Sequence, residues 1–256
     1  MDSVTVDTGD AAVAGDLTVP GDPLGMVLFA HGSGSSRHSP RNRAVARGLN
    51  QAGFGTLLLD LLTPAEERAD AETAALRFDI GLLTRRLTGA IDWLASAPPT
   101  PTVPPTPTAP PTPTVPPTVT ASPPPDAPPT STAPPTSTAP PTASAPLALF
   151  GASTGAAAAL AAAAVRPERV RAVVSRGGRP DLAEPWLGRV RAPVLLIVGG
   201  RDLQVAEWNN AASRKLPGRA EVRIVPGAGH LFQEPGALEQ VTALAVGWFR
   251  RYLGHR

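Results

Sequence analysis

One serine, one aspartate and one histidine lie where they could form a nucleophilic triad. Ser153 lies in Gly-Ala-Ser-Thr-Gly at residues 151–155, a G-x-S-x-G pattern between an apolar segment and an alanine-rich one. Asp202 and His230 come later in the chain, each shortly after another apolar segment. A serine hydroxyl attacks a carbonyl when a histidine takes its proton and a carboxylate orients that histidine. The residues and their order, Ser…Asp…His, therefore predict acyl transfer through a covalent intermediate.

Each triad position also has an alternative interpretation. The turn around Ser153 could be an ordinary glycine-rich turn or a phosphate loop, although neither G-K-[ST] nor G-x-G-x-x-G is present. Asp181 is a second candidate for the acid, because it also follows a predicted strand. His230 could be a surface-loop histidine, but it is the histidine that follows a late strand. The remaining histidines are His31 and His38, which precede the nucleophile, and His255 at the chain's end.

When a serine attacks a carbonyl, the carbonyl oxygen becomes negatively charged, and backbone N–H groups can stabilise this oxyanion. Such N–H groups are expected from two places. Thr154 directly follows the proposed nucleophile, and a His-Gly-Ser-Gly-Ser-Ser loop at residues 31–36 follows an apolar run. Each would supply one N–H to the negative oxygen. Within the loop the candidates are Gly32, Ser33 and Gly34, and we favour Ser33.

Two arginines follow a predicted strand on the edge expected to carry Ser153. Arg176 and Arg179 could receive a substrate carboxylate or phosphate, because a guanidinium binds such groups through two parallel hydrogen bonds. The simpler interpretation is that they pair with Asp181, with Glu184 or with solvent.

The apolar segments alternate between strand-like and helix-like patterns. Strands are expected at 4–6, 11–19, 26–30, 56–59, 147–150, 170–175, 193–198 and 221–225. Helices are expected from Ser39-Pro40 to Ala52 and at 76–94, 156–165, 207–216 and 238–248. Alternating strands and helices after an N-terminal hairpin predict an α/β fold, with a mostly parallel sheet, helices on both faces and no large lid domain. Such sheets bind ligands at the carboxyl ends of their strands.

A Pro/Thr-rich insert at residues 97–146 interrupts this pattern. It carries 21 of the 32 prolines, 13 threonines and one charge, Asp126. Proline lacks an N–H and few large apolar side chains are present, so we expect an extended, disordered segment. The chain is therefore interpreted as a single domain, residues 1–256, interrupted by this insert. The insert joins a helix to the start of a strand, so it lies at the edge of the sheet opposite the carboxyl ends of the strands. We therefore expect it to lie away from bound ligands.

Composition excludes several classes of protein and site. There is no cysteine, and therefore no disulfide, thiolate metal site or cysteine nucleophile. Asp60, Glu66 and Glu67 lack the spacing of metal ligands and are interpreted as surface or loop charges. No apolar run is long enough for a membrane helix, and the first residues lack a signal-peptide pattern, so we expect a cytoplasmic protein without a membrane partner. The net charge is only +2, without a basic cluster, so no nucleic-acid partner is expected.

Four stretches resemble a known superfamily: HGSGSSRHSPRN, FGASTGAAAAL, VVSRGGRPDL and VPGAGHLF. They are similar to α/β-hydrolases of the dienelactone-hydrolase-like branch, and in particular to bacterial serine hydrolases sometimes fused to a phosphoribosyltransferase domain. The resemblance implies the α/β-hydrolase fold and a Ser153, Asp202 and His230 triad. Two departures are visible. Dienelactone hydrolases typically use cysteine, so their lactone substrate does not carry over, and this sequence has no room for a phosphoribosyltransferase domain.

We therefore expect a serine hydrolase that acts on a small carboxylic ester or lactone, with thioesters as a further class. No metal or cofactor is required, and the oligomeric state is open. The segment from Ser175 to Pro193 is too short for a large lid, which predicts a shallow, open site. The alternatives are a catalytically silent binding or scaffold protein on the same fold and a secreted, wall-associated esterase whose insert is a glycosylated stalk.

Overall fold

The chain folds around one eight-stranded sheet. The computed structural model describes residues 1–96 and 145–254. The strand order is β1-β2-β4-β3-β5-β6-β7-β8; β3 to β8 are mutually parallel, and β1 and β2 form an antiparallel hairpin along β4. The strands are β1 Asp2–Asp7, β2 Ala12–Thr18, β3 Met26–Ala30, β4 Gly55–Leu59, β5 Leu147–Ala152, β6 Val170–Arg176, β7 Val194–Gly199 and β8 Ala220–Val225. The predicted α/β fold class is confirmed.

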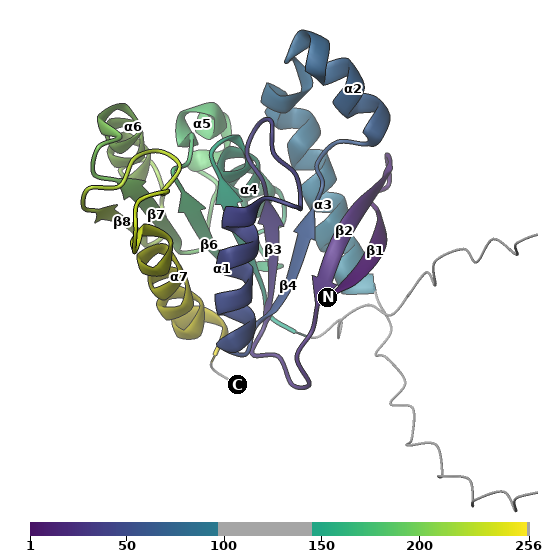
Figure 1. The fold of residues 1–256 in the computed structure, drawn as a ribbon, viewed down its shortest axis with the longest axis horizontal. Coiled ribbons are helices and arrows are strands. Elements are labelled where there is room, and N and C mark those ends of the chain that lie inside the picture. Colours follow the sequence, from purple (N-terminus) through teal and green to yellow (C-terminus); the bar gives the residue numbers. More distant parts are fainter. Residues whose placement is uncertain (97–144, 255–256) are drawn as a thin grey trace, which may run out of the picture.

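Helices cover both faces of the sheet (Figure 1). The longer helices are α1 Pro40–Gln51, α2 Pro64–Thr73, α3 Ile80–Ser96, α4 Thr154–Val165, α6 Leu203–Ser213 and α7 Ala237–Leu253, and α5 Glu184–Leu187 is a single turn. Buried residues of α1 and α7 form one apolar cluster with the sheet, and those of α3, α4 and α6 form the other. Strands β3, β4, β5 and β7 are buried along their whole length, as expected for strands between two helical layers.

The predicted helix start at Ser39-Pro40 is confirmed. The Ser39 side chain accepts a hydrogen bond from the backbone N–H of Asn42, and Pro40 occupies the first helical position. The apolar stripe predicted a helix from Leu76, but α3 begins at Ile80. Leu76 instead lies in a 3₁₀ turn, and the Asp79 carboxylate accepts from the backbone N–H of Leu82, which fixes the helix start there.

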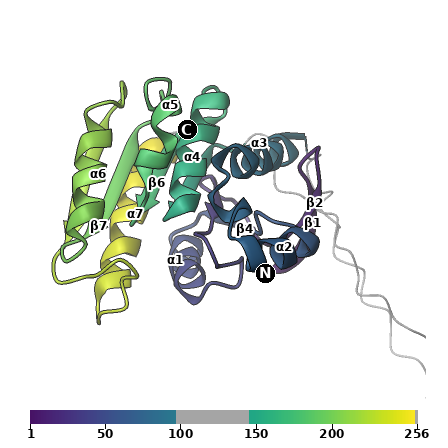
Figure 2. The ribbon, with the colours of Figure 1, turned by 90° about the horizontal axis from the view of Figure 1, so that it is seen from above.

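Helix α2 was not predicted, because it has no apolar stripe. Asp70 is its one buried residue. A capping box between Thr63 and Glu66 fixes its start, and Glu66 also pairs with Arg86 of α3. Glu66, interpreted from the sequence as a surface or loop charge, thus lies in a helix with a partner on each carboxylate oxygen. Seen from above, the helix lies over the sheet next to β4 (Figure 2).

The predicted extended state of the insert falls almost wholly on residues outside the described ones. Its two attachment points are described. Helix α3 ends at Ser96 and β5 begins at Leu147, so both lie at the edge of the sheet opposite the carboxyl end of β5. An ion pair between Asp92 and Arg166 links the ends of α3 and α4 at this edge. None of the described helices is both long and apolar enough to cross a membrane.

Replacing residues 98–145 with about five Gly/Ser residues is expected to leave kcat/KM for an ester substrate within twofold to threefold of its original value, as expected for attachment points far from the carboxyl edge. The free energy of unfolding should rise by about 1–2 kcal/mol, because a shorter loop costs less to close. Steady-state kinetics and urea denaturation measure both quantities. A tenfold loss of kcat/KM in a folded variant would contradict this prediction and place the insert at the active site.

Candidate active site

Ser153 lies on a sharp turn between β5 and α4. Its backbone has φ 50° and ψ −120°, an unfavourable conformation for a residue with a side chain. Neighbouring backbone holds this turn: the Ser153 N–H donates to the carbonyl of Arg176 at 3.2 Å, and the Arg179 N–H donates to the carbonyl of Ser153 at 3.2 Å. A strained serine between strand and helix has the geometry of a nucleophile elbow.

The two glycines of the G-x-S-x-G pattern are required by close backbone contacts. A Cβ atom on Gly155 would lie 2.3 Å from the carbonyl oxygen of His31 and 2.4 Å from that of Ala30. A Cβ atom on Gly151 would lie 2.4 Å from the Cα of Ala156. The glycines therefore let α4 approach both its own strand and the 31–36 loop.

Gly155→Ala is expected to lower the free energy of unfolding by about 2–3 kcal/mol, because the new methyl group meets rigid backbone on two sides. Gly188→Ala is the matched control, since no atom lies within 4 Å of its would-be Cβ and its φ is −65°. The control should change stability by less than about 0.5 kcal/mol. Chemical denaturation of both variants measures the difference, and equal effects would contradict the close approach.

His230 and Asp202 form a hydrogen-bonded pair. The His230 Nδ1–H donates to Asp202 Oδ2 at 2.7 Å, which leaves Nε2 free to face a substrate or a serine hydroxyl. The two loops that carry them lie against each other: the Arg201 N–H donates to the Ala228 carbonyl at 2.9 Å, and a Cβ on Gly199 would lie 2.5 Å from that same oxygen. The adjacent strands β7 and β8 thus bring Asp202 and His230 together.

Glu234 joins these loops, and sequence reasoning did not identify it. Its carboxylate accepts a hydrogen bond from the backbone N–H of Gly229 at 3.1 Å and pairs with the Arg201 side chain. Its own backbone N–H and that of Gly229 help to hold the pKa of Glu234 below its usual value. This carboxylate ties the segment before His230 to the segment before Asp202.

Ser153 and His230 line one pocket of about 200 Å³. Its wall also includes Gly32 and Ser33 of the 31–36 loop, together with Arg176. The loop closely approaches the serine, since a Cβ on Gly32 would lie 3.0 Å from the Ser153 Cβ. The structure therefore brings Ser153, His230, Ser33 and Arg176 to one place at the carboxyl edge of the sheet.

The two expected oxyanion residues contact each other. The Ser33 N–H donates to the Thr154 hydroxyl oxygen at 2.8 Å, so this amide has a partner inside the protein. The same loop is anchored further along, where the Arg37 N–H donates to Asp60 Oδ1 at 2.7 Å and the Arg37 guanidinium pairs with the same carboxylate. Asp60 lies in the loop after β4, as one part of its interpretation as a surface or loop charge had it, but at 7% exposure it is not a surface charge. Its burial depends on the parallel pairing of β3 with β4, which the local sequence does not reveal.

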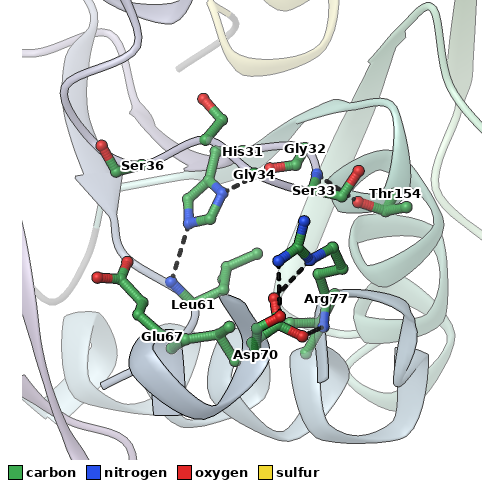
Figure 3. A pocket seen from close by; sticks show the side chains of 13 residues that line it. His31, Gly32, Ser33, Gly34, Ser36, Leu61, Glu67, Asp70, Arg77 and Thr154 are labelled. Carbon is green, nitrogen blue, oxygen red and sulfur yellow. Dashed lines mark hydrogen bonds and ion pairs between the residues drawn. The ribbon is translucent and has the colours of Figure 1, made fainter. Parts of the chain in front are cut away.

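A second cavity, of about 290 Å³, lies on the side of the 31–36 loop that faces α2 (Figure 3). Its apolar lining is Leu61, Leu62 and Leu83, and Ser33 and Thr154 line it as well. His31 fixes the loop above it: Nε2 accepts from the Leu61 N–H at 3.1 Å, and Nδ1 contacts the Gly32 carbonyl at 2.9 Å. Burial lowers the pKa of His31, which favours the neutral ring that these contacts need.

Three charged side chains also line this cavity, beside the glycines and serines of the 31–36 loop. Figure 3 shows Glu67, Asp70 and Arg77 along the side formed by α2 and the turn after it. Asp70 and Arg77 neutralise each other, with 2.5 Å between Asp70 Oδ2 and Arg77 Nε. Burial and the nearby charge of Asp60 raise the pKa of Glu67.

The two arginines predicted to contact a substrate anion have different surroundings. Arg179 forms two parallel hydrogen bonds with Asp181, at 2.9 and 2.7 Å, and its guanidinium lies 4.2 Å from the ring centroid of Trp208. Arg176 is 8% exposed and lines the pocket of Ser153. Asp181, the alternative acid, is thus engaged by Arg179, whereas Asp202 contacts His230.

Arg41 also lines the pocket of Ser153, and sequence reasoning missed it. It lies in the first turn of α1, directly after the Ser39-Pro40 helix start. That helix start follows β3, which places it at the carboxyl edge of the sheet. This position is the feature of the sequence that could have identified Arg41 as a pocket residue. Within the described residues, no group of three or more His, Asp or Glu side chains is arranged to hold a metal ion.

Comparisons with known proteins place the chain in a family. No protein-family model matches it. Two curated proteins of Mycobacterium tuberculosis, from strains CDC 1551 and H37Rv, are 50% identical over 252 residues and are both named "Putative phosphoribosyl transferase". The match covers 98% of this chain but 46% of theirs, so the chain spans about half the length of these curated relatives.

Solved structures match over nearly the whole chain. A dienelactone hydrolase from Anabaena variabilis is 47% identical with a TM-score of 0.77, covering 98% of this chain and 97% of that one. Est1E from Butyrivibrio proteoclasticus is 13% identical with a TM-score of 0.68 and full coverage of both chains, which shows a shared fold. From its identity to the Anabaena enzyme and its sheet topology, the chain belongs to the α/β-hydrolase family, in the dienelactone-hydrolase-like branch.

Proposed function

We propose that this chain is a serine hydrolase that cleaves small carboxylic esters or lactones, and also thioesters, through an acyl-enzyme. Ser153 Oγ attacks the carbonyl carbon while His230 takes its proton, and Asp202 stabilises the imidazolium that forms. The bond to the leaving alcohol breaks as His230 returns the proton to the alcohol oxygen. Water, activated by the same histidine, then releases the acid.

The observation that carries this proposal is the shared pocket. A strained serine and a histidine paired with a carboxylate line it, and the three come from the ends of β5, β7 and β8. The backbone N–H of Thr154, at the start of α4, and that of Ser33 are the proposed oxyanion donors. In this proposal the Ser33 N–H exchanges its bond to the Thr154 hydroxyl for one to the negative oxygen.

The relatives support hydrolysis over transfer of a phosphoribosyl group. The dienelactone hydrolase that is 47% identical covers this chain end to end. The curated proteins named as phosphoribosyl transferases are matched over less than half of their length, so their name supports no transferase proposal for this chain.

Labelling with a fluorophosphonate tests the proposal. We expect one covalent adduct at Ser153, located by peptide mass spectrometry, and none in Ser153→Ala. A screen of p-nitrophenyl esters by acyl length then measures the substrate range. The absence of both labelling and hydrolysis in folded protein would favour a catalytically silent binding protein on the same fold.

A further inference from the structure

Two arginines in the pocket of Ser153 have no carboxylate partner. Nε and Nη1 of Arg176 are buried without a hydrogen-bond partner, and so is Nε of Arg41. Among the described residues, no ion pair includes either side chain. Burial and the nearby charge of Arg41 lower the pKa of Arg176 to about 10, which leaves it charged at neutral pH.

Other arginines in this chain show what a buried guanidinium normally requires. Arg86 is 3% exposed and pairs with both Asp10 and Glu66. Arg179, three residues after Arg176, is only partly buried, with 29% of its side chain exposed, and it still pairs with Asp181. Desolvated charges are costly unless a counter-charge is present, so two neighbouring cations without one form a site for an anion. The guanidinium fork favours a carboxylate or a phosphate.

The position of the arginines relative to His230 indicates which part of the substrate carries the anion. His230 lines the same pocket as Arg41 and Arg176, and it must stand beside the alcohol oxygen to which it returns the proton. The apolar residues Leu61, Leu62 and Leu83 line the 290 Å³ cavity instead, on the side of the 31–36 loop that faces α2. Ser33 lines both cavities, so the carbonyl at the oxyanion donors can reach into either one.

We propose that Arg41 and Arg176 bind a carboxylate or phosphate on the alcohol part of the ester, while an apolar acyl part occupies the cavity below α2. The substrate class is therefore an apolar acyl ester of an anionic alcohol. The inference rests on the proposed hydrolase function. The reaction itself is ordinary hydrolysis: the ester C–O bond breaks, the alcohol takes the proton from His230, and water supplies the oxygen of the released acid.

Matched esters test the inference in the intact protein. The first pair is 4-(butyryloxy)benzoate and its neutral methyl ester, which differ in charge on the leaving group. For Arg176→Gln, we expect the loss of kcat/KM on the anionic ester to exceed the loss on the neutral ester by about 30–300-fold, mostly through KM. Arg41→Gln should show a smaller excess, about tenfold, because Arg41 is less buried. Equal losses on the two esters would overturn the proposal.

Arg179→Gln is the matched control, because this arginine belongs to the same segment but is paired with Asp181 and does not line the pocket. It should change neither ester's kcat/KM by more than about twofold. A second pair, mono-4-nitrophenyl succinate and 4-nitrophenyl butyrate, places the charge on the acyl side. An Arg176-dependent preference for the succinate instead of the benzoate would overturn the assignment to the alcohol side.

Binding measured without turnover separates this inference from the proposed function. Calorimetry on Ser153→Ala should show saturable binding of 4-hydroxybenzoate or 4-hydroxyphenyl phosphate, and the stronger of the two identifies the anion. Adding Arg176→Gln should weaken that binding at least tenfold, and binding unchanged by it would contradict the site. If the protein bound the anion but hydrolysed no ester, the result would contradict the proposed hydrolase function and still support the anion site.

Thermal unfolding distinguishes a purely structural role of Arg176, as a residue that stabilises the fold, from a role in anion binding. Because its buried charge lacks a partner, Arg176→Gln should keep or raise the melting temperature in anion-free buffer. Added inorganic phosphate should raise the melting temperature of the original protein more than that of the variant. A lower melting temperature for the variant, with no response of either protein to phosphate, would mean that Arg176 is a structural residue.

Discussion

Ser153→Ala is expected to lower kcat for ester hydrolysis by about 10⁴–10⁶-fold, because the variant has no nucleophile on the turn between β5 and α4. The fold should remain intact, since alanine removes only the hydroxyl. Steady-state kinetics on a p-nitrophenyl ester, with active protein quantified beforehand, measure the loss.

Ser35→Ala is a suitable control, because Ser35 lines the same pocket but lies on a loop without an elbow. It should retain kcat within about one order of magnitude if it is no nucleophile. More than a tenth of the original activity in Ser153→Ala, after contaminating esterases are excluded, would disprove the role of Ser153. Circular dichroism of both variants confirms that lost activity is not lost structure.

Asp202→Asn is expected to reduce kcat by roughly 10⁴-fold. The carboxylate accepts the Nδ1–H of His230 at 2.7 Å, which selects the tautomer whose Nε2 is the proposed proton acceptor for Ser153. An amide group can donate to Nδ1 instead, which stabilises the wrong tautomer and removes the negative charge that stabilises the imidazolium. The measurement is kcat at saturating ester, compared with the original protein at one pH.

Asp181→Asn provides the comparison, because Asp181 follows the neighbouring strand β6 but pairs with Arg179. Its effect on kcat should be less than about tenfold, since neither Asp181 nor Arg179 lines the pocket that Ser153 and His230 share. If the two substitutions gave the reverse order of effects, the acid would follow β6, and the proposed triad would be wrong.

The local sequence was sufficient for the fold class and for most elements. Buried strands between two helical layers appear as continuous apolar runs, and a helix facing a core shows steps of three and four. Both signals depend on neighbours within a few residues, so they can be read directly from the chain. Helix α2 lacks an apolar stripe because a capping box and ion pairs hold it in place. Helix α3 begins later than its apolar stripe because Asp79 sets the helix start.

The candidate catalytic residues could also be predicted, for a topological reason. Ser153, Asp202 and His230 each follow a strand, and parallel strands of one sheet bring their carboxyl ends to the same edge. Residue type and position after a strand were therefore enough to nominate the triad. The 2.7 Å contact between His230 and Asp202 needed the adjacency of β7 and β8, which is a property of the assembled sheet.

The partners of several charged side chains were decided by the tertiary structure. The pairing of Arg179 with Asp181 was one of the interpretations of the sequence, but the burial of Arg176 beside Ser153 with Arg41 was visible only in the fold. Asp60 and Arg37 are likewise far apart in the chain but meet because β3 and β4 are neighbours. Apolar burial follows a periodicity that each segment carries within itself, whereas the partner of Asp60 and the lack of an ion pair for Arg176 depend on which distant loops meet at the sheet's edge.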